Sequence, residues 1–342
     1  MFGNDISIDL GTTTMLVYIK GKGIVLNEPT VIAVDTDTNE VVGVGSEALE
    51  MLGRTPPNIS AVHPLHDGVI SHYTLTQEMI RRLFRRVLRR AGGRPRIMMC
   101  VPSGVTDVEQ RAVIDAAREV GARDIYVIEE PVAAALGAGY DISRAHGTMV
   151  IDIGGGTTDI AVMSLGGVVA SRSMKIAGDE FTEEIVRYMR REMNLYIGPR
   201  TAERLKVTVG GAVKRDKEIV CEAKGISAIT GLPRTVTVSS HDICDIFDDF
   251  VYNITERARE VLEETPPELH GDIIRDGIVM TGGGSLLYGL DRRIERELGV
   301  TCRLAENITE CVVRGSGIAL ESIDTVTDPT HVFHKKAYIH EL

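Results

Sequence analysis

Two short stretches of the chain share one design. IDLGTTTM at residues 8–15 and IDIGGGTTDI at residues 151–160 each place an aspartate in an apolar run that leads into glycine and threonine. Glycine inside a strand or helix costs roughly 0.5–1 kcal/mol relative to alanine, so its repeated use indicates a purpose. Turns of glycine and hydroxyl residues present successive backbone N–H groups, which can converge on phosphate oxygens. The two stretches therefore predict a pair of phosphate-binding turns.

Asp9 and Asp152 hold matching places just before the two turns. Mg²⁺ prefers oxygen ligands and is typically held by one or two carboxylates together with waters and substrate phosphates, so the pair predicts a metal-bound polyphosphate. Either turn alone reads equally well as a tight connection, and the duplication favours phosphate binding. Neither turn matches the GxxxxGK[ST] or GxGxxG patterns or contains lysine, so backbone dipoles and the metal must neutralise the phosphate charge.

Two further stretches carry weaker signals. VMTGGGSLL at 279–287 predicts a strand that turns into a helix near Ser285, and the positive end of such a helix attracts anions. TAERLK at 201–206 puts Glu203 and Lys206 on one helical face. That pair predicts either ligand contacts or a solvated ion pair, which without other context is the more frequent case.

Glu130 lies at the end of an apolar strand, between Glu129 and Pro131. A carboxylate at such a strand end can orient or deprotonate a water that attacks a terminal phosphate. A glutamate in the first turn of a helix is also favoured by the helix dipole alone. Both interpretations remain open from these residues.

The elements that must position these residues repeat a pattern. The first 45 residues predict strands, in the runs DISIDLG, TMLVYIK, GIVLNEP, TVIAV and EVVGVG. Apolar residues at helical spacing predict a helix over 75–91, and a Thr106-x-x-Glu109 capping box predicts another. The strands PRIMMCVPSG and DIYVIEEP flank that second helix, and the helix VAAALGAG follows.

The second half begins again with strand-forming runs, from Gly147 to about residue 178. We expect helices over about 179–210 and 241–264, a strand-containing insert between them, a strand before the 282–284 glycines and a helix from about 285. A last strand, TCRLA, precedes a small-residue helix near 315–322, and the tail after 324 is expected to be loosely ordered. The chain therefore predicts two similar α/β domains whose turns face a common cleft.

Composition bounds the class of protein. The chain has 342 residues, of which 43% are hydrophobic and 25% charged, as in soluble globular proteins of about two domains. Its net charge of −11 argues against nucleic acid as a partner. Five cysteines without a CxxC pair favour a reduced, cytosolic chain. No apolar run approaches the ~18 residues of a membrane span, and no signal peptide is expected.

Five stretches taken together resemble the actin-like ATPase superfamily, and within it the bacterial cell-shape actins of the MreB family. They are IDLGTTT, IEEPVAAALGAG, DIGGGTTD, GPRTAERLK and TGGGSLL. Further stretches are similar to the same family, and the resemblance runs from about residue 5 to 323. These stretches are KGKGIVLNEPTVIAV, HDGVI, AGDEFTEEIVRY, TGLPRTV and TPPELHGDI. It implies an actin-like, ribonuclease H-like duplicated α/β fold with two mixed-sheet domains around a nucleotide cleft. The implied subdomains are IA (1–32, 66–145 and 315–335), IB (33–65), IIA (146–181 and 246–314) and IIB (182–245), with a tail at 336–342.

The resemblance also implies roles for single residues. Glu130 and Thr157 would position the hydrolytic water, and Asp9 and Asp152 would act on Mg²⁺, mainly through its waters. The implied contacts to ATP or ADP are Gly11, Thr12, Thr13, Thr14, Gly154, Gly155, Gly156, Thr157, Thr158, Gly178, Asp179, Glu203, Arg204, Leu205, Lys206, Gly283, Gly284, Ser285 and Leu286. Three positions depart from the family pattern: Thr14 replaces an amide side chain, Asp159 stands where Glu is usual, and Thr208 replaces a usual Glu.

The function implied is a slowly hydrolysing ATPase that forms head-to-tail protofilaments under the cytoplasmic membrane and guides cell-wall synthesis. Its partners would be further copies of the chain, MreB paralogues, membrane proteins of wall synthesis and the anionic membrane surface. Arginines of the basic helix and the loop after it predict electrostatic attachment, or else a solvated helix face; they include Arg85, Arg86, Arg89 and Arg94. Competing functions are a sugar kinase or phosphatase of the same superfold, a chaperone ATPase, and a filament for plasmid or organelle positioning.

Overall fold

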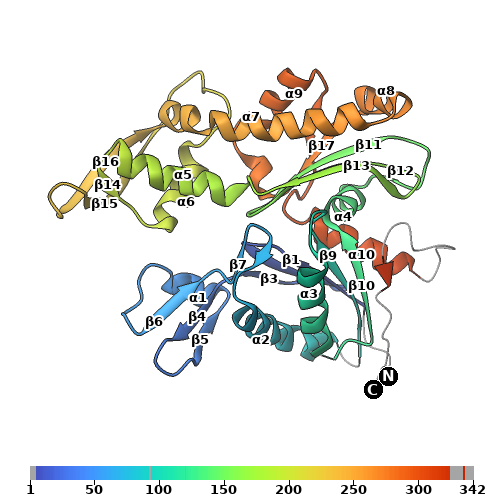
Figure 1. Ribbon diagram of the computed structural model, residues 1–342, viewed down its shortest axis with the longest axis horizontal. Coiled ribbons are helices and arrows are strands. Elements are labelled where there is room, and N and C mark those ends of the chain that lie inside the picture. The colour runs from blue at the N-terminus through green and yellow to red at the C-terminus, as the bar shows by residue number, and fades with distance from the viewer. Residues whose placement is uncertain (1–4, 92–93, 120, 324–333, 336–342) are drawn as a thin grey trace.

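The computed structural model describes residues 5–91, 94–119, 121–323 and 334–335, and these form two lobes, each built on its own sheet (Figure 1). All five cysteines are free, as expected, and four of them are buried. Among the helices of the described residues, none has the length and apolar character needed to cross a bilayer.

The first lobe is built on a six-stranded sheet in the order β19-β10-β9-β1-β2-β3. Its strands are β1 (Ile6–Leu10), β2 (Thr14–Ile19), β3 (Gly23–Pro29), β9 (Arg96–Val101), β10 (Asp124–Glu129) and β19 (His334–Lys335). The first three strands form an antiparallel meander, and β9 and β10 add in parallel to β1. The helices of this lobe are α2 (Tyr73–Ala91), α3 (Asp107–Glu119), α4 (Glu130–Gly137) and α10 (Cys311–Ser322).

The second lobe repeats this topology in a five-stranded sheet with the order β13-β12-β11-β17-β18. Its strands are β11 (Thr148–Ile153), β12 (Thr158–Ser164), β13 (Gly167–Met174), β17 (Ile278–Thr281) and β18 (Cys302–Leu304). An antiparallel meander again precedes two parallel additions. The helices α5 (Gly178–Arg191), α7 (Ser240–Glu264), α8 (Pro267–Asp276) and α9 (Leu290–Leu298) belong to this lobe.

Each lobe carries a small three-stranded sheet at its outer end, together with one helix (Figure 1). In the first lobe these elements are β4 (Ile32–Asp35), β5 (Val41–Val44), β6 (Ile59–Val62) and α1 (Ser46–Met51). In the second they are β14 (Leu195–Tyr196), β15 (Val220–Ser227), β16 (Pro233–Ser239) and α6 (Pro199–Val209). A two-stranded hairpin, β7 (Leu65–His66) and β8 (Val69–Ile70), leads from the first small sheet toward α2.

The expected amphipathic helix over 75–91 is present, because Met79, Ile80, Leu83, Phe84 and Val87 are buried along one face of α2. The short elements α1, α8, β14 and the β7–β8 hairpin were not predicted. The tail after residue 324 lies outside the described residues except for β19.

The expected helix from about residue 285 is wrong. Gly283–Leu286 form a single 3₁₀ turn, η1, and α9 begins only at Leu290. Gly289, with φ of 72°, separates the two elements. A residue in this left-handed region cannot continue a right-handed helix, so the helix end that was expected to attract anions lies elsewhere.

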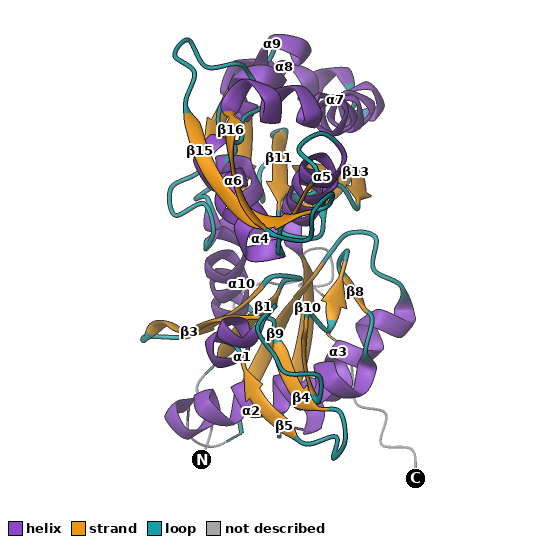
Figure 2. Ribbon diagram, turned by 90° about the vertical axis from the view of Figure 1, so that its left-hand side faces the viewer, coloured by secondary structure: helices purple, strands orange, loops and turns teal. Residues whose placement is uncertain are grey.

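The helices α4 and α10 lie one above the other between the lobes (Figure 2). A Cβ atom on Gly315 would overlap the carbonyl oxygen of Ala133, and one on Gly137 would overlap that of Cys311. The two backbones are therefore in direct contact. One apolar cluster joins both helices to residues of both sheets, including Cys100 of β9 and Val150 of β11, so this pair packs the lobes together.

Candidate functional site

The two duplicated turns have the same backbone geometry. Gly11 N donates a hydrogen bond to Thr14 O over 3.1 Å, and Gly154 N donates to Thr157 O over 2.8 Å. Each bond closes a hairpin between the first two strands of its sheet. Asp9 and Asp152 each precede the turn glycine by two residues, on a central strand. The same hairpin turn, preceded by an aspartate, therefore occurs at equivalent places in both lobes.

The two turns meet, and only glycine allows it. A Cβ atom on Gly155 would overlap Thr13 Oγ1, and one on Gly156 would overlap Thr12 Oγ1. The glycines of the second lobe thus lie directly against the hydroxyls of the first, which brings two rows of backbone and hydroxyl donors to one place.

A third turn joins them from the β7–β8 hairpin. Gly68 N donates to Thr12 Oγ1 over 3.0 Å, and a Cβ on Gly68 would lie 2.6 Å from Thr157 Cγ2. Asp67 and Gly68 both have positive φ, at 52° and 73°. An Asp-Gly pair of this conformation is a strong hairpin signal, so the HDGVI stretch held the information that would have located this turn.

A cleft of about 1000 Å³ opens between the lobes beside these turns. Most residues that the sequence assigned to nucleotide, metal or water line it: Asp9, Gly11, Thr12, Thr13, Thr14, Glu130, Asp152, Gly154, Gly155, Gly156, Thr157, Gly178, Asp179, Glu203, Lys206, Gly283, Gly284 and Leu286. The lining that the sequence did not single out includes His63, Pro102, Arg200, Arg215, Tyr288 and Thr309. These come from loops and helix ends, whose position depends on the whole fold.

Four of the assigned residues are not part of the lining. Thr158 is buried and donates from Oγ1 to Ile176 O over 2.6 Å. Ser285 is buried and donates to Thr281 O over 2.6 Å. Leu205 belongs to the core of the second lobe. Arg204 donates to Glu222 O over 2.8 Å, on the side of the small sheet. Their side chains support the walls of the cleft instead of facing it.

Three carboxyl groups gather at the bottom of the cleft, of which those of Asp152 and Glu130 are buried and that of Asp9 is partly buried. Burial and the charge of Asp152 raise the pKa of Asp9 to about 7. Burial also raises the pKa of Asp152 to about 7, against the hydrogen bond that Thr281 Oγ1 donates to it over 2.6 Å. Burial and the neighbouring charges of Asp159 and Asp9 hold the pKa of Glu130 well above its usual range.

This donor set suits a hard divalent cation, because the oxygens are carboxylates and the crowded negative charge needs a counter-charge. Within the described ranges, no cluster of three or more potential metal-ligating side chains occurs. The sequence prediction of a magnesium ion beside Asp9 and Asp152, held mainly through phosphate and water, stays a prediction.

The pKa shifts predict a stability effect of Asp152→Asn. Because the pKa of Asp152 is raised from 3.8 to about 7, the folded chain without metal binds more protons than the unfolded chain, and its stability falls as the pH rises through that window. Asparagine has no charge to bury. The variant should melt about 5 °C above the parent protein at pH 8 in EDTA without nucleotide, and by less at pH 6, as followed by circular dichroism.

Asp272→Asn is the matched control, because the hydrogen bond from Gly147 N lowers the pKa of Asp272. Its effect on the melting temperature should not change between pH 6 and pH 8. If Asp152→Asn melts below the parent at both pH values, burial of the Asp152 charge does not destabilise the folded chain.

Lys206 provides a positive charge on the opposite wall. Its Nζ lies 2.7 Å from Glu203 Oε2 and donates to Gly178 O and Thr182 Oγ1 over 2.8 and 2.9 Å. The Lys206 side chain is 15% exposed and that of Glu203 50%, so the pair is shielded from solvent on the lysine side only. It ties α6 to the first turn of α5, next to Asp179, whose pKa burial raises to about 6.

Glu130 is the first residue of α4 and is buried, with Glu129 at the N-cap and Pro131 in the first turn. This geometry agrees with a dipole-favoured glutamate, and the same side chain lines the cleft. Across the lobes, Asp159 Oδ1 accepts a hydrogen bond from Ser103 N over 3.0 Å. Asp159, which departs from the family pattern, thus joins the two lobes beneath the cleft.

Comparisons with known proteins agree with this arrangement. The family model of the MreB/Mbl protein matches residues 3–328. The chain is 46% identical to the cell shape-determining protein Mbl of Bacillus subtilis (strain 168), over 95% of this chain and 98% of that protein. It is also 46% identical to the cell shape-determining protein MreB of Escherichia coli (strain K12), over 95% of each chain.

Two solved structures are similar in fold. MreB5 of Spiroplasma citri bound to AMPPNP superposes with a TM-score of 0.89 at 38% identity, over 94% of this chain and 97% of that one. The MamK double helical filament superposes with a TM-score of 0.78 at 21% identity, over 95% and 99% of the two chains. The second likeness shows the fold alone.

Proposed function

The chain belongs to the MreB/Mbl family of actin-like proteins, and from this premise we propose that it binds magnesium ATP in the cleft, hydrolyses it slowly and assembles into filaments that determine cell shape. The observation that carries the proposal is the pair of matching turns, headed by Asp9 and Asp152, that face one cleft. The nucleotide-bound MreB5 of Spiroplasma citri supports it.

The residues of the cleft suggest how the chemistry is divided. Backbone N–H and hydroxyl groups of the two turns hold the phosphates, and Glu203 and Lys206 border the ribose and the adenine. Magnesium, when bound near Asp9 and Asp152, supplies charge neutralisation. Glu130 and Thr157 position the attacking water, and Glu130 takes up its proton when ionised. Magnesium bound near Asp9 and Asp152 would favour the ionised form, because it would offset two of the charges that raise the pKa of Glu130.

We propose that nucleotide binding closes the two lobes on each other. The division of the lobes into the four subdomains given above also stays a proposal. Contacts across the cleft already exist. A Cβ atom on Gly68 would lie 2.6 Å from Thr157 Cγ2, and His66 Nε2 on the β7–β8 hairpin lies 3.7 Å from Glu183 Oε1 on α5. A phosphate group between the turns would strengthen these contacts, so the nucleotide state can bias closure and with it the contact between subunits.

Exposed apolar side chains lie at both ends of the second lobe. Ile229 and Leu232, between β15 and β16, are 74% and 65% exposed at one end, and Ile274 on α8 is 64% exposed at the other (Figure 1). A contact between unlike ends is heterologous and need not close, so it builds a filament. We propose that these ends meet in the protofilament.

The experiment that tests the function is sedimentation and electron microscopy with and without ATP. The parent chain should form filaments with magnesium ATP, whereas Ile229→Asp should raise the critical concentration roughly tenfold or more, because burying an isoleucine contributes about 1.5–3 kcal/mol. Tyr252→Ser, an exposed site on α7, is the control and should assemble normally. Phosphate transfer to a small acceptor without any polymer would favour the kinase or phosphatase alternative.

The basic surface on α2 is narrower than the sequence suggests. Arg86 lies 3.3 Å from Glu28 and 3.7 Å from Glu47, and Glu78 engages Arg81 and Arg82. The side chain of Arg89 lies outside the described residues. Arg85 and Arg94 remain exposed, and they are the residues that we propose contact an anionic membrane at its inner face.

Reversal of both charges, in Arg85→Glu with Arg94→Glu, should weaken binding to phosphatidylglycerol vesicles roughly tenfold or more, since each cation near the surface contributes about 1 kcal/mol. Arg191→Glu with Arg296→Glu, at exposed sites on α5 and α9, controls for the same change in net charge. Unchanged vesicle binding by the double variant would exclude electrostatic attachment at this place. Contacts with MreB paralogues and with membrane proteins of wall synthesis remain part of the proposal.

A further inference from the structure

The short strand β19 lies in a part of the chain that the family model does not match. That match ends at residue 328, whereas β19 is formed by His334–Lys335. It pairs antiparallel with β10, with Lys335 opposite Tyr126 and His334 opposite Val127. The C-terminal tail, defined here as residues 324–342, therefore adds to the sheet of the first lobe a strand that lies outside the matched region.

The strand β10 offers the tail a backbone edge. β10 pairs in parallel with β9 on one side, and β19 is the only described strand that pairs with its other side. An edge strand presents N–H and C=O groups to which a further strand can bind.

The position of this edge is fixed by packing on both faces of β10. Ile125 and Val127 belong to the core of the first lobe. Tyr126 and Ile128 belong to the apolar cluster that α4 and α10 share with both sheets. Because both faces are packed, β10 cannot rotate its edge away, and the edge presents a rigid template for pairing.

The observed pairing is short. It involves two residues of each strand, and opposed residues of an antiparallel ladder alternate between hydrogen-bonded and non-hydrogen-bonded pairs. One of the two pairs is therefore hydrogen-bonded. Residues 324–333 connect β19 to the end of α10, and a short tether of this kind gives an effective concentration on the order of 1 mM. A tail from another molecule can compete for the edge at a similar concentration.

We propose that the edge of β10 is a docking site for an extended strand and that its ligand is the C-terminal tail of this chain, which binds from the same copy as β19 and, where that strand is displaced, from a second copy. Main-chain hydrogen bonds supply the affinity in such strand addition, so the backbone of the tail matters more than its side chains. No residue of β10 is part of the cleft lining, and the inference does not depend on nucleotide binding.

The test uses the full-length chain with His334→Pro and Lys335→Pro. Proline has no N–H group and interrupts a strand ladder, so the double variant cannot pair its own tail whichever residue is hydrogen-bonded. Hydrogen-exchange mass spectrometry of residues 124–129 follows the edge. One backbone amide of this segment should exchange about tenfold faster than in the parent chain, as an effective concentration of about 1 mM gives for a site of about 0.1 mM affinity.

A synthetic peptide then supplies the tail of a second copy. The peptide THVFHKKAYIHEL, residues 330–342, should restore slow exchange to the proline variant at millimolar concentration. The same peptide with proline at both positions should leave the exchange fast, because it cannot complete the ladder.

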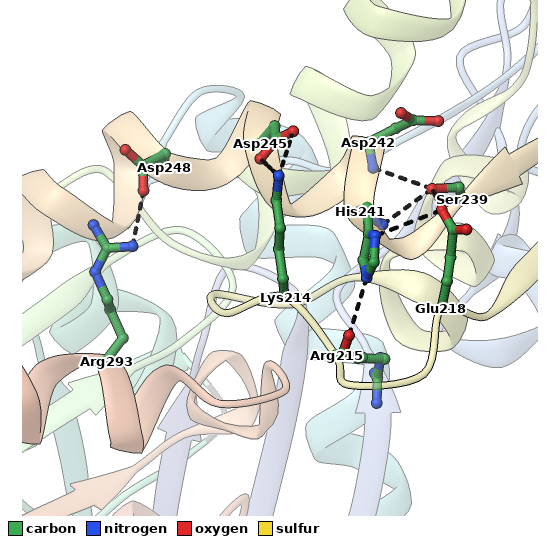
Figure 3. A network of polar contacts seen from close by, with 9 residues as sticks. All are labelled: Lys214, Arg215, Glu218, Ser239, His241, Asp242, Asp245, Asp248 and Arg293. Carbon is green, nitrogen blue, oxygen red and sulfur yellow. Dashed lines mark hydrogen bonds and ion pairs between the residues drawn. The ribbon is translucent and has the colours of Figure 1, made fainter.

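His334→Thr with Lys335→Thr is the matched control, since it removes the same side chains but keeps both N–H groups in residues that favour strands. It should exchange as the parent chain does. Lys214→Thr controls for the loss of a lysine, because Lys214 lies in the second lobe, with Nζ 2.9 Å from Asp245 Oδ1 on α7 (Figure 3). It should leave exchange in β10 unchanged.

Equal exchange rates in the parent chain and the proline variant would overturn the inference. A peptide that does not slow the exchange at several millimolar would overturn docking from a second copy, and a threonine variant as fast as the proline variant would overturn pairing through the backbone. None of these measurements contains nucleotide, so their failure leaves the proposed function standing, and a chain that binds no ATP leaves this inference standing.

Discussion

Glu130→Gln is expected to lower the rate of ATP hydrolysis roughly 100-fold, because a positioned acid or base contributes about 10²–10⁴ to such a rate. Glutamine keeps the size and the hydrogen-bonding oxygen of Glu130 but cannot take up a proton. Phosphate release and calorimetry with magnesium ATP measure the rate and the affinity separately. We expect the affinity to stay within about twofold, since the phosphates are held by the two turns.

Glu129→Gln is a matched control from the neighbouring position. Glu129 is the N-cap residue of α4 and is not part of the cleft lining. The control should hydrolyse ATP at nearly the parent rate. Equal rates in the two variants would remove Glu130 from the mechanism, and a parallel loss of rate and ATP affinity would assign it a structural role instead.

Gly315→Ala is expected to cause the largest loss of stability. The added methyl group would overlap the Ala133 carbonyl oxygen and would lie 2.5 Å from Gly137 N. Both are backbone atoms of α4, so no side-chain rotation relieves the overlap, and α10 must move away from α4. Overpacking typically costs about 1–3 kcal/mol even where side chains can adjust. We expect the melting temperature to fall by more than about 10 °C, or the variant to be insoluble.

Gly271→Ala provides the control, since Gly271 lies inside α8 and a Cβ there meets nothing within 4 Å. Alanine at an open helical position stabilises by about 1 kcal/mol, so the two substitutions should have opposite signs. A melting temperature of Gly315→Ala equal to that of the parent would show that α4 and α10 separate freely.

The packing of α4 against α10 also concerns the cleft. Glu130 is the first residue of α4, so a displaced α4 would move its carboxyl group relative to the turns. A soluble Gly315→Ala protein should therefore hydrolyse ATP more slowly than the parent chain, even where its affinity for ATP is unchanged. The order of the chain hides this link, because α10 lies more than 170 residues after α4.

Local chemistry made much of the fold predictable from the sequence. Apolar runs of strand length bounded by glycine, asparagine and proline predicted the meanders, and these are present in both sheets. The helical spacing of Ile80, Leu83, Phe84 and Val87 predicted the buried face of α2. The prediction of a helix from Ser285 was wrong for a local reason. The glycines that allow a close turn also allow the helical conformation to end after the four residues of η1.

The sequence by itself determined the two aspartate-headed turns, because backbone conformation and strand pairing within a hairpin depend on neighbouring residues. Only the tertiary structure decided that Gly155 lies against Thr13, that Lys206 is buried against α5, and that Arg215 stacks on Tyr288. These contacts join segments from different elements, and most lie far apart in the chain. Their distances, and the shared burial that raises the carboxyl pKa values, follow from how the packed elements fit together and leave no pattern in any one stretch of sequence.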